Sequence, residues 1–418
     1  MVKRWGLALV LLMWASAAWG WQVHGFVDGR SGMRLQDDAV QRQAILNEVR
    51  LQLDLNHMSD LAIWQFRADL VGDEAAGETD QDLERGHGVL DLREANVLLT
   101  PFYFLDVKLG RQILTWGTGD LLFINDLFPK DWQSFFIGRD VEYLKAPSDA
   151  AMFSFYPSWA NIDIIYVPRF DADRYISGER ISYWNPMLSR RAGSGDDMAV
   201  DQRGQWFRED EWHLRISRNI EGVEWAAYAY DGYWKSPQGV DSVYRSYFPK
   251  LRVFGASVRG SLAGGVVNLE TGYYDSREDR RGDDAMVPNS EMRVLVGYER
   301  EIARNFSAAL QYYLEYMQDY SAYRRTLPEG MAARDEDRHV VTLRLTRQLL
   351  NQNLELSLFS YWSPSDRDSY LRPYVKYKAS DAVSLYLGAN LFFGDVPHTF
   401  FGQFEDNSNL YAGVRYSF

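Results

Sequence analysis

Over most of its length the chain alternates between apolar and polar residues with a period of two. Residues 49–55 read VRLQLDL and residues 341–346 read VTLRLT, and the pattern returns at 64–70, 105–109 and 354–358. Because successive side chains of a β-strand point to opposite faces, each segment has one apolar and one polar face. Beyond the N-terminus no run approaches 18 uncharged apolar residues, which excludes membrane-spanning helices there.

The alternating segments predict eighteen strands. We place them at 22–34, 42–56, 60–71, 89–99, 102–115, 149–156, 160–168, 210–218, 222–234, 244–262, 265–275, 290–302, 305–318, 338–349, 353–362, 369–379, 382–393 and 408–418. Sixteen strands would result if the first segment or a weak one near 150–165 is not a strand. All of residues 21–418 then form a single all-β domain.

The connections between these segments alternate in length. Short ones, with the Asn, Gly, Pro and Ser residues of tight turns, lie at 56–60, 100–101, 157–159, 219–221, 263–264, 303–304, 351–352 and 380–381. Long polar ones lie between them, including 116–148 and 169–209. Short turns at one end and long loops at the other are typical of a transmembrane antiparallel β-barrel in the outer membrane of a Gram-negative bacterium. We therefore expect short periplasmic turns and long extracellular loops.

Aromatic residues are abundant, with 22 Phe, 26 Tyr and 14 Trp. Membrane barrels carry aromatic belts at both membrane–water interfaces, where one part of each ring contacts hydrocarbon and the other part contacts water. We expect such a role for aromatic residues near predicted strand ends, namely Tyr312, Tyr316, Phe392, Phe393, Tyr411 and Tyr416. A large soluble β-sandwich or propeller would also use aromatic residues, but no blade repeat is present.

Residues 1–20 read as a cleaved secretory signal peptide. Lys3 and Arg4 precede an apolar run, and Ala18-Trp19-Gly20 fits the small-residue cleavage pattern. The apolar run is too short for a good membrane span, although an N-terminal anchor is the alternative. Absence of cysteine excludes a disulfide scaffold, a cysteine-ligated metal and a thiol nucleophile. The formal charge of −13 gives no electrostatic basis for nucleic-acid binding.

The last predicted strand places Tyr416 and Phe418 on one face with Leu410, Ala412 and Val414. This resembles the carboxy-terminal signature of outer-membrane β-barrels, which ends in Phe with apolar residues at alternate positions before it. The resemblance implies recognition by the barrel-assembly machinery. A last strand that pairs with the first also closes the sheet, which removes both unpaired edges from lipid.

The long connection at 116–148 is the third on its side of the predicted barrel. Its segment contains Gly110-Arg111-Gln112, Trp116-Gly117, Asp120 and Pro129-Lys130-Asp131. This pattern resembles outer-membrane porin families, some of which export anionic polysaccharide, over about 25 residues. In trimeric porins the third external loop folds into the barrel and narrows it, so the resemblance implies a pore-constricting loop here. Packing against the barrel rim alone is the alternative.

The candidate constriction residues are the polar residues of this loop and of the strand before it. They are Asp106, Lys108, Gln112, Asp120, Asp126, Lys130, Asp131, Arg139 and Asp140. This set contains five acids and three bases, which predicts a weak preference for cations. Charges that line a narrow pore bias the sign of the permeant ion. Apolar residues of the same loop are expected to anchor it.

The sequence thus predicts a porin for passive diffusion of small hydrophilic solutes, without a cofactor or metal. Outer-membrane lipid and lipopolysaccharide would surround it, and a homo-oligomer is possible. The alternatives are a specific export or uptake channel, for instance for an anionic polysaccharide, a structural or complex-forming barrel, and a barrel-wall hydrolase. A hydrolase built on His213 and Ser217 has no supporting motif, so we expect no enzyme.

Overall fold

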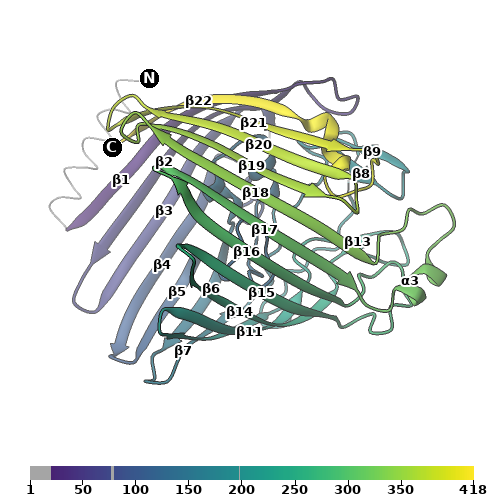
Figure 1. Ribbon diagram of the computed structural model, residues 1–418, viewed down its shortest axis with the longest axis horizontal. Helices are drawn as coiled ribbons and strands as arrows, with labels where there is room; N and C mark the ends of the chain where they lie inside the picture. The colour runs from purple at the N-terminus through teal and green to yellow at the C-terminus, as the bar shows by residue number, and fades with distance from the viewer. Residues whose placement is uncertain (1–19, 77–79, 197) are drawn as a thin grey trace.

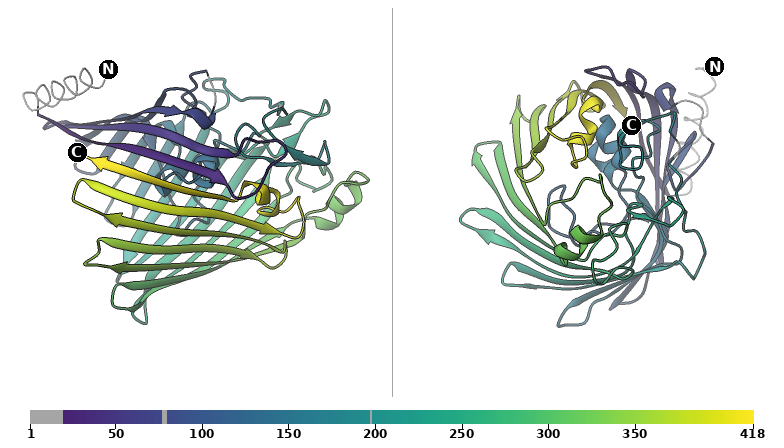
Figure 2. Two further views of the ribbon diagram at one scale, coloured as in Figure 1. Left: turned by 90° about the horizontal axis from the view of Figure 1, so that it is seen from above. Right: turned by 90° about the vertical axis from the view of Figure 1, so that its right-hand side faces the viewer.

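In the computed structural model, which describes residues 20–76, 80–196 and 198–418, eighteen strands close into one antiparallel sheet (Figures 1 and 2). The barrel strands are β1 (Trp21–Arg34), β2 (Ala44–Met58), β3 (Ala62–Asp73), β4 (Leu90–Phe102), β5 (Leu105–Ile113), β6 (Pro147–Phe155), β7 (Asn161–Val167), β10 (Glu211–Ile220), β11 (Val223–Tyr233), β14 (Lys250–Leu262), β15 (Gly265–Ser276), β16 (Glu291–Ala303), β17 (Phe306–Met317), β18 (Asp337–Leu349), β19 (Leu354–Ser363), β20 (Asp368–Lys378), β21 (Val383–Gly394) and β22 (Asn409–Ser417). Apart from Gly20, the expected signal peptide lies outside the described residues.

Each barrel strand pairs with the next one along the chain, and β22 pairs with β1. The closing register runs from Phe26 opposite Ser417 to Arg34 opposite Asn409. Closure leaves no unpaired strand edge along this seam, which is the condition for a sheet to lie in hydrocarbon.

The prediction of an eighteen-stranded antiparallel barrel is confirmed, and each predicted segment overlaps one barrel strand. The largest difference in boundaries is at the predicted strand 244–262, where β14 begins only at Lys250. Residues Ser246–Tyr247 instead form β13, which pairs with β12 (Gly239–Val240) in a separate hairpin. Pro249 lies between the two pieces and has no N–H to donate to a strand ladder.

Short turns and long loops alternate as predicted. Both residues of the Glu221-Gly222 and Ala263-Gly264 turns have positive φ, between 50° and 83°, which matches the twist of a two-residue hairpin. The long loops hold the remaining short elements. These are η1 (Glu74–Ala76), α2 (Trp132–Ile137), η2 (Val141–Leu144), β8 (Tyr183–Asn185), β9 (Arg190–Ala192), α3 (Tyr320–Thr326) and η3 (Gly402–Asn407).

The two faces of the barrel wall differ sharply. Val49, Leu310 and Val414 are 61%, 55% and 47% exposed on the outside, whereas the alternate residues Arg50 and Glu270 are only 3% and 2% exposed inside. The period-two pattern of the sequence therefore has its apolar side outward and its polar side in the lumen. Among the described residues no helix has the length and apolar content needed to cross a membrane.

Four strands carry an aromatic doublet near the long-loop end, and each doublet has one ring on either face. The pairs, outer ring first, are Tyr273 and Tyr274, Tyr312 and Tyr313, Trp362 and Tyr361, and Phe393 and Phe392; the outer rings are 42–56% exposed and the inner ones 1–5%. The expected outward placement of Phe392 and Tyr411 is wrong, since both are 1% exposed. Their strand positions alternate with those of Phe393 and Tyr416, which do face outward.

Candidate functional site: the loop inside the barrel

Residues 114–146, which connect β5 and β6, fold into the barrel, and we call them the inserted loop. The right-hand view of Figure 2 shows helix α2 of this loop inside the ring of strands. Apolar residues of the loop, such as Ile124, Phe135 and Phe136, belong to one buried cluster with inward-facing aromatic rings of the wall. The loop is therefore packed in the lumen, and its path is set by contacts with several parts of the wall.

The first limb of the loop is held by Glu270 of β15. The Glu270 carboxylate accepts hydrogen bonds from the backbone N–H groups of Thr118, Gly119 and Asn125 at 2.7, 3.1 and 2.8 Å. It also accepts from the Thr118 hydroxyl at 2.9 Å and the Asn125 amide at 3.0 Å. A buried carboxylate that accepts this many bonds is a strong anchor, because hydrogen bonds to a charged group are stronger than neutral ones.

Beyond this anchor, Asp120 reaches β18 on the far side of the lumen. Arg344 Nη2 donates to Asp120 Oδ1 at 2.7 Å. Gln311 of β17 accepts from the Asp120 N–H at 2.8 Å and donates to its carbonyl at 2.9 Å. β18 is the ninth strand from β5 around the ring of eighteen, so the Asp120–Arg344 pair lies diametrically opposite the strand from which the loop starts. The loop thus crosses the barrel.

The middle of the loop is helix α2. Asp131 caps its N-terminus, because the Asp131 side chain accepts from the Ser134 backbone N–H at 2.7 Å. Gly138 ends the helix with φ of 97° and lies against the Tyr411 ring, where an added Cβ would be 2.3 Å from the nearest ring atom. Glycine is required here by both the left-handed backbone and the close approach.

The last limb of the loop is bound to β1, β2 and β22 by ion pairs. Arg139 Nε donates to Glu48 Oε2 at 2.9 Å. Arg30 Nη2 lies 3.4 Å from Asp140 Oδ1, and Arg415 also pairs with Asp140. Together with the anchor at Glu270 on β15, these contacts tie the loop to opposite sides of the lumen.

Two carboxyls of this limb have pKa shifts of opposite sign. Burial raises the pKa of Asp140, but the nearby Arg30 and Arg415 guanidinium groups outweigh burial, and its pKa lies below the usual range. Burial and the Asp140 charge raise the pKa of Glu142 above the usual range. Asp140 therefore remains ionised at neutral pH, which keeps its two ion pairs intact.

The nine predicted constriction residues divide into several environments. Asp106 and Lys108 lie on β5 below the loop, where Asp106 accepts from Thr100 Oγ1 at 2.6 Å and from the Tyr156 hydroxyl at 3.0 Å. Lys108 Nζ is 4.0 Å from a carboxylate oxygen of Glu94. These two residues are near the short-turn end of the barrel, and their partners Glu94 and Tyr156 lie outside the inserted loop.

Three of the nine are buried inside the loop itself. Lys130 Nζ is 2.9 Å from Asp126 Oδ1, and Arg174 of the next long loop is 3.3 Å from Asp131. Asp126, Lys130 and Asp131 are 6%, 3% and 3% exposed. Their position favours a role in holding the shape of the loop.

The Gly-Arg-Gln motif is divided between the two faces of the wall. Gln112 is fully buried, and its amide donates to the Ala150 carbonyl at 3.0 Å. Arg111 lies on the other face, where its guanidinium is 3.1 Å from Asp149 and 3.3 Å from Glu84 of the preceding long loop. The motif therefore joins the start of the inserted loop to the neighbouring loop and strand.

Three of the predicted residues form ion pairs between the inserted loop and the barrel wall. They are Asp120, Arg139 and Asp140. The sequence interpretation missed the wall partners Glu270 and Gln311. Both lie on polar, inward faces of alternating strands, but so do many other residues, and nothing in the sequence singles them out. The aromatic doublets are the signal that could have shown where the loop docks, since they place a ring on the inner face as well.

The barrel-wall hydrolase alternative has no geometric support. His213 is 2% exposed and stacks on Phe128 of the inserted loop, with ring centroids 4.5 Å apart. In the described part of the chain no hydrogen bond joins His213 to Ser217. Residues 20–76, 80–196 and 198–418 also contain no cluster of three or more potential metal ligands.

We expect Glu270→Gln to loosen the first limb of the inserted loop. A neutral amide has one acceptor oxygen and would turn its NH₂ toward N–H donors, so docking of residues 118–125 should weaken by about 1–3 kcal/mol. Hydrogen exchange of these amides should become faster. Glu299→Gln on the exposed part of β16 is the matched control. Unchanged exchange at Thr118 and Gly119 would show that Glu270 is not the anchor.

The fold and the inserted loop together define a closed eighteen-stranded antiparallel barrel with a loop across its lumen. No known protein family and no curated protein matches the sequence. Solved structures with a similar fold include a triple mutant of Rhodopseudomonas blastica porin, at 11% identity and a TM-score of 0.41, covering 95% of this chain and 100% of that one. OmpF of Salmonella typhi in complex with daunomycin gives 9% identity and a TM-score of 0.48, covering 95% and 97%. At this level of similarity neither solute nor assembly transfers to this chain.

Proposed function

We propose that this chain is an outer-membrane channel for passive diffusion of small hydrophilic solutes. The supporting observation is the apolar exterior of a closed barrel whose lumen contains charged side chains and a loop that crosses it. The exposed outer residues include Val49, Leu310 and Val414, which in water would form an apolar surface around the whole wall. Contact with lipid removes that surface from water, and the polar lumen then provides the aqueous route.

We propose that the route is narrowest beside the Asp120–Arg344 pair. The Asp120 and Arg344 side chains are 37% and 28% exposed, so they remain in contact with water although they are bonded to each other. Asp126, Lys130 and Asp131 are buried and are proposed as residues that shape the loop. Asp106 and Lys108 would line the route below it.

Burial of Asp126, Lys130 and Asp131 removes the excess of acids that predicted a cation preference. Without the three buried residues, the charged candidates are Asp106, Lys108, Asp120, Arg139 and Asp140, and Arg344 joins them as a base. Three acids then stand against three bases, so we expect weak ion selectivity. Measurement of reversal potentials in a salt gradient tests this expectation.

The rival functions receive less support. An exporter of an anionic polymer needs a continuous basic track, but the wall residues Arg50, Arg67 and Arg293 are ion-paired with acids. A structural barrel that surrounds a partner needs a free lumen, whereas the inserted loop occupies this one. Paired charges and a packed loop both favour a general diffusion channel.

The remaining proposals follow from the outer-membrane location. Residues 1–20 are proposed as the signal peptide for export, and the outer leaflet partner is lipopolysaccharide. Assembly would require the barrel-assembly machinery, with Tyr416 and Phe418 in the recognition segment. A homo-oligomer is an additional possibility that cross-linking in membranes tests directly.

Incorporation of the purified protein into a planar lipid bilayer tests the proposed function. Stepwise, ohmic current increases in potassium chloride are expected, because the lumen provides a water-filled path. Absence of steps from protein that is folded by heat-modifiable gel mobility would contradict the proposal.

The proposed lipid face gives a second test on one strand. Leu343 of β18 pairs in register with Leu310, an exposed outer residue, whereas the adjacent Arg344 faces the loop. Leu343→Arg should destabilise the barrel by about 2–4 kcal/mol if it lies near the bilayer midplane. Arg344→Leu should leave folding closer to intact and change conduction.

Denaturant unfolding of both variants in lipid vesicles measures the difference, with Leu345→Ile on the same face as control. A larger loss of stability in Arg344→Leu than in Leu343→Arg would show that Arg344, and not Leu343, lies on the lipid face of the wall.

A further inference from the structure

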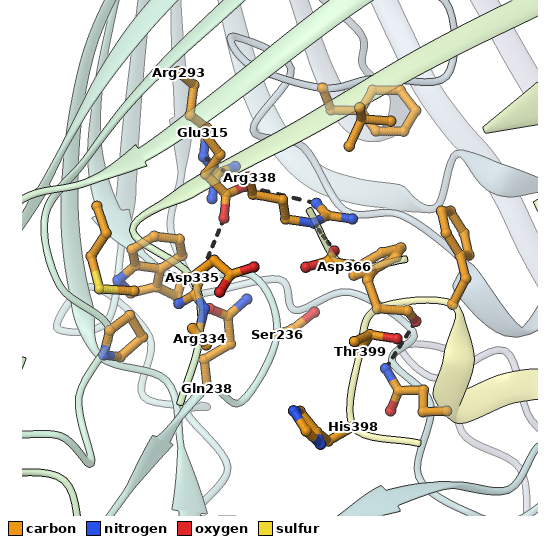
Figure 3. Close-up of a pocket in the computed structure, with 18 of the residues that line it drawn as sticks. Ser236, Gln238, Arg293, Glu315, Arg334, Asp335, Arg338, Asp366, His398 and Thr399 are labelled. Carbon is orange, nitrogen blue, oxygen red and sulfur yellow. Dashed lines mark hydrogen bonds and ion pairs between the residues drawn. The ribbon is translucent and has the colours of Figure 1, made fainter. Parts of the chain in front are cut away.

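A large cavity lies between the inserted loop and the long-loop end of the barrel, and we call it the vestibule. Its volume is about 900 Å³, which is within the range of about 300–1,000 Å³ for small-molecule sites. Residues of the inserted loop form one wall, and the ends of strands β14 to β19 with parts of several long loops form the others. Figure 3 shows the labelled polar side chains gathered around it.

The aromatic walls of the vestibule are fixed in place. The hydroxyl of Tyr361 donates to the Leu121 carbonyl at 2.6 Å, and that of Tyr313 donates to Glu315 at 2.9 Å. Both tyrosines are nearly buried, so the ring surface open to a ligand comes from Trp132, which is partly exposed, and Phe400, which is 41% exposed. The Trp132 indole N–H donates to Asp173 at 3.2 Å, which holds this ring without further loss of conformational entropy when a ligand binds.

The charged groups of the vestibule largely neutralise one another. Six bases and five acids line it, and Glu211 and Glu291 behind the lining pair with Lys235 and Arg293. Arg334 Nη2 is 2.8 Å from Glu315 Oε1 and Arg338 Nε is 2.6 Å from Asp366 Oδ2. The site therefore offers many polar groups but little net charge, so an ionic ligand gains little from it.

One guanidinium of the vestibule keeps hydrogen-bonding capacity for a ligand. Arg334 donates to Glu291 and Glu315 through one terminal nitrogen, and its side chain is 47% exposed, so its other N–H groups can bind a ligand. The Trp234 indole N–H is buried below the surface of the cavity and is not accessible to a ligand.

From these observations we infer that the vestibule is a binding site for neutral saccharides. A sugar ring has apolar C–H faces that stack on aromatic rings and hydroxyls at its edge that bond to paired guanidinium and carboxylate groups. A balanced charge fits such a ligand and disfavours an anionic polymer. The inference rests on the proposed function, because it identifies the solute class that the channel admits.

Isothermal titration of the full-length protein in detergent with three probes tests the inference. Maltotriose is neutral and has ring faces, trigalacturonate has rings with carboxylates, and sorbitol has hydroxyls without a ring. Maltotriose should bind at least about tenfold more tightly than the other two, and it should interrupt the channel current in a planar bilayer. Equal or tighter binding of trigalacturonate, or equal binding of sorbitol, would overturn the inference.

Two variants assign the binding to this cavity. Trp132→Ala should weaken maltotriose binding roughly tenfold or more, since it removes a partly exposed ring of the lining on which the sugar can stack. Trp132→Phe keeps a ring, guards against a folding defect and should retain more of the binding. Trp206→Ala, which removes a 51% exposed indole outside the vestibule, is the matched control. Unchanged maltotriose binding in folded Trp132→Ala would place the sugar elsewhere and overturn the assignment.

The two proposals fail in distinguishable ways. Current steps in salt without sugar test the channel, whereas calorimetry in detergent requires no conduction. Current without maltotriose binding would overturn only the saccharide site. Maltotriose binding without current would support the site and contradict the diffusion channel.

Discussion

Replacement of residues 116–145 by a short Gly-Ser link is expected to raise the single-channel conductance several-fold. The inserted loop crosses the lumen from β5 to Arg344 on the opposite wall, so its removal widens the path along which ions flow. The design is geometrically simple, because Ile113 of β5 pairs in register with Pro147 of β6. A short link therefore joins neighbouring strand ends, and the barrel ladders on both sides remain intact.

Planar-bilayer recordings of wild type and deletion at one salt concentration give the comparison. Removal of the loop exposes the inner aromatic rings, including Tyr274, Tyr361 and Tyr370, so heat-modifiable mobility must first show a folded barrel. Replacement of residues 324–330 near helix α3 is the matched control, since this segment projects away from the barrel in Figure 1. Equal conductance of deletion and wild type would mean that the loop does not restrict the pore.

The vestibule adds a second consequence of the same deletion. Its wall on the loop side, including Leu121 and Trp132, disappears, so maltotriose binding should be lost as conductance rises. The control replacement of residues 324–330 leaves the inserted loop and its anchors in place, so this variant should retain much of the binding. A rise in conductance together with a loss of maltotriose affinity would show that the loop both narrows the pore and forms the site.

Period-two alternation was sufficient to predict the barrel, because a wall with lipid on one side and water on the other imposes that pattern on every strand. The boundaries were less certain where a local residue decides them, as Pro249 does for β14. The entry of the third loop into the lumen was also expected from its rank and apolar content.

The partners of that loop were not predictable in the same way. Asp120 and Arg344 are 224 residues apart, and Thr118 and Glu270 are 152 apart. Their contact depends on barrel closure and on how far the loop reaches, neither of which local patterns encode. The interior aromatic surface was missed because both rings of the Phe392-Phe393 doublet were assigned to the membrane belt, although only one ring of a doublet can face outward.

Deletion of Phe418 is expected to lower the outer-membrane level of the protein strongly. In the closed barrel the Phe418 N–H donates to the Gly25 carbonyl at 3.0 Å, and the Gly25 N–H donates to the Phe418 carbonyl at 3.1 Å. The Phe418 ring lies over Gly25, where an added Cβ would be 2.8 Å from the ring. The residue thus belongs to the seam between the first and last strands, and we also propose it as part of the assembly signal.

Comparison of a substitution with the deletion separates these roles. Phe418→Ala keeps the backbone pair with Gly25 but removes the ring, whereas deletion removes both. If assembly depends on recognition of the aromatic ring, both variants should accumulate as unfolded protein for periplasmic proteases. If only closure matters, Phe418→Ala should approach the wild-type level. Phe393→Ala removes another outward ring, 47% exposed on β21, and is the matched control.

Quantitative immunoblots of outer-membrane fractions, with heat-modifiable mobility as the measure of folding, distinguish the outcomes. We expect Phe418→Ala to resemble the deletion. The Phe418 ring is partly exposed on a seam that is already hydrogen-bonded, so it contributes less to the finished barrel than to recognition before the barrel forms. The remaining seam still has nine register pairs from Phe26–Ser417 to Arg34–Asn409, so closure does not depend on Phe418 alone. Normal levels of folded barrel in the deletion would contradict both the assembly role and the outer-membrane assignment that depends on it.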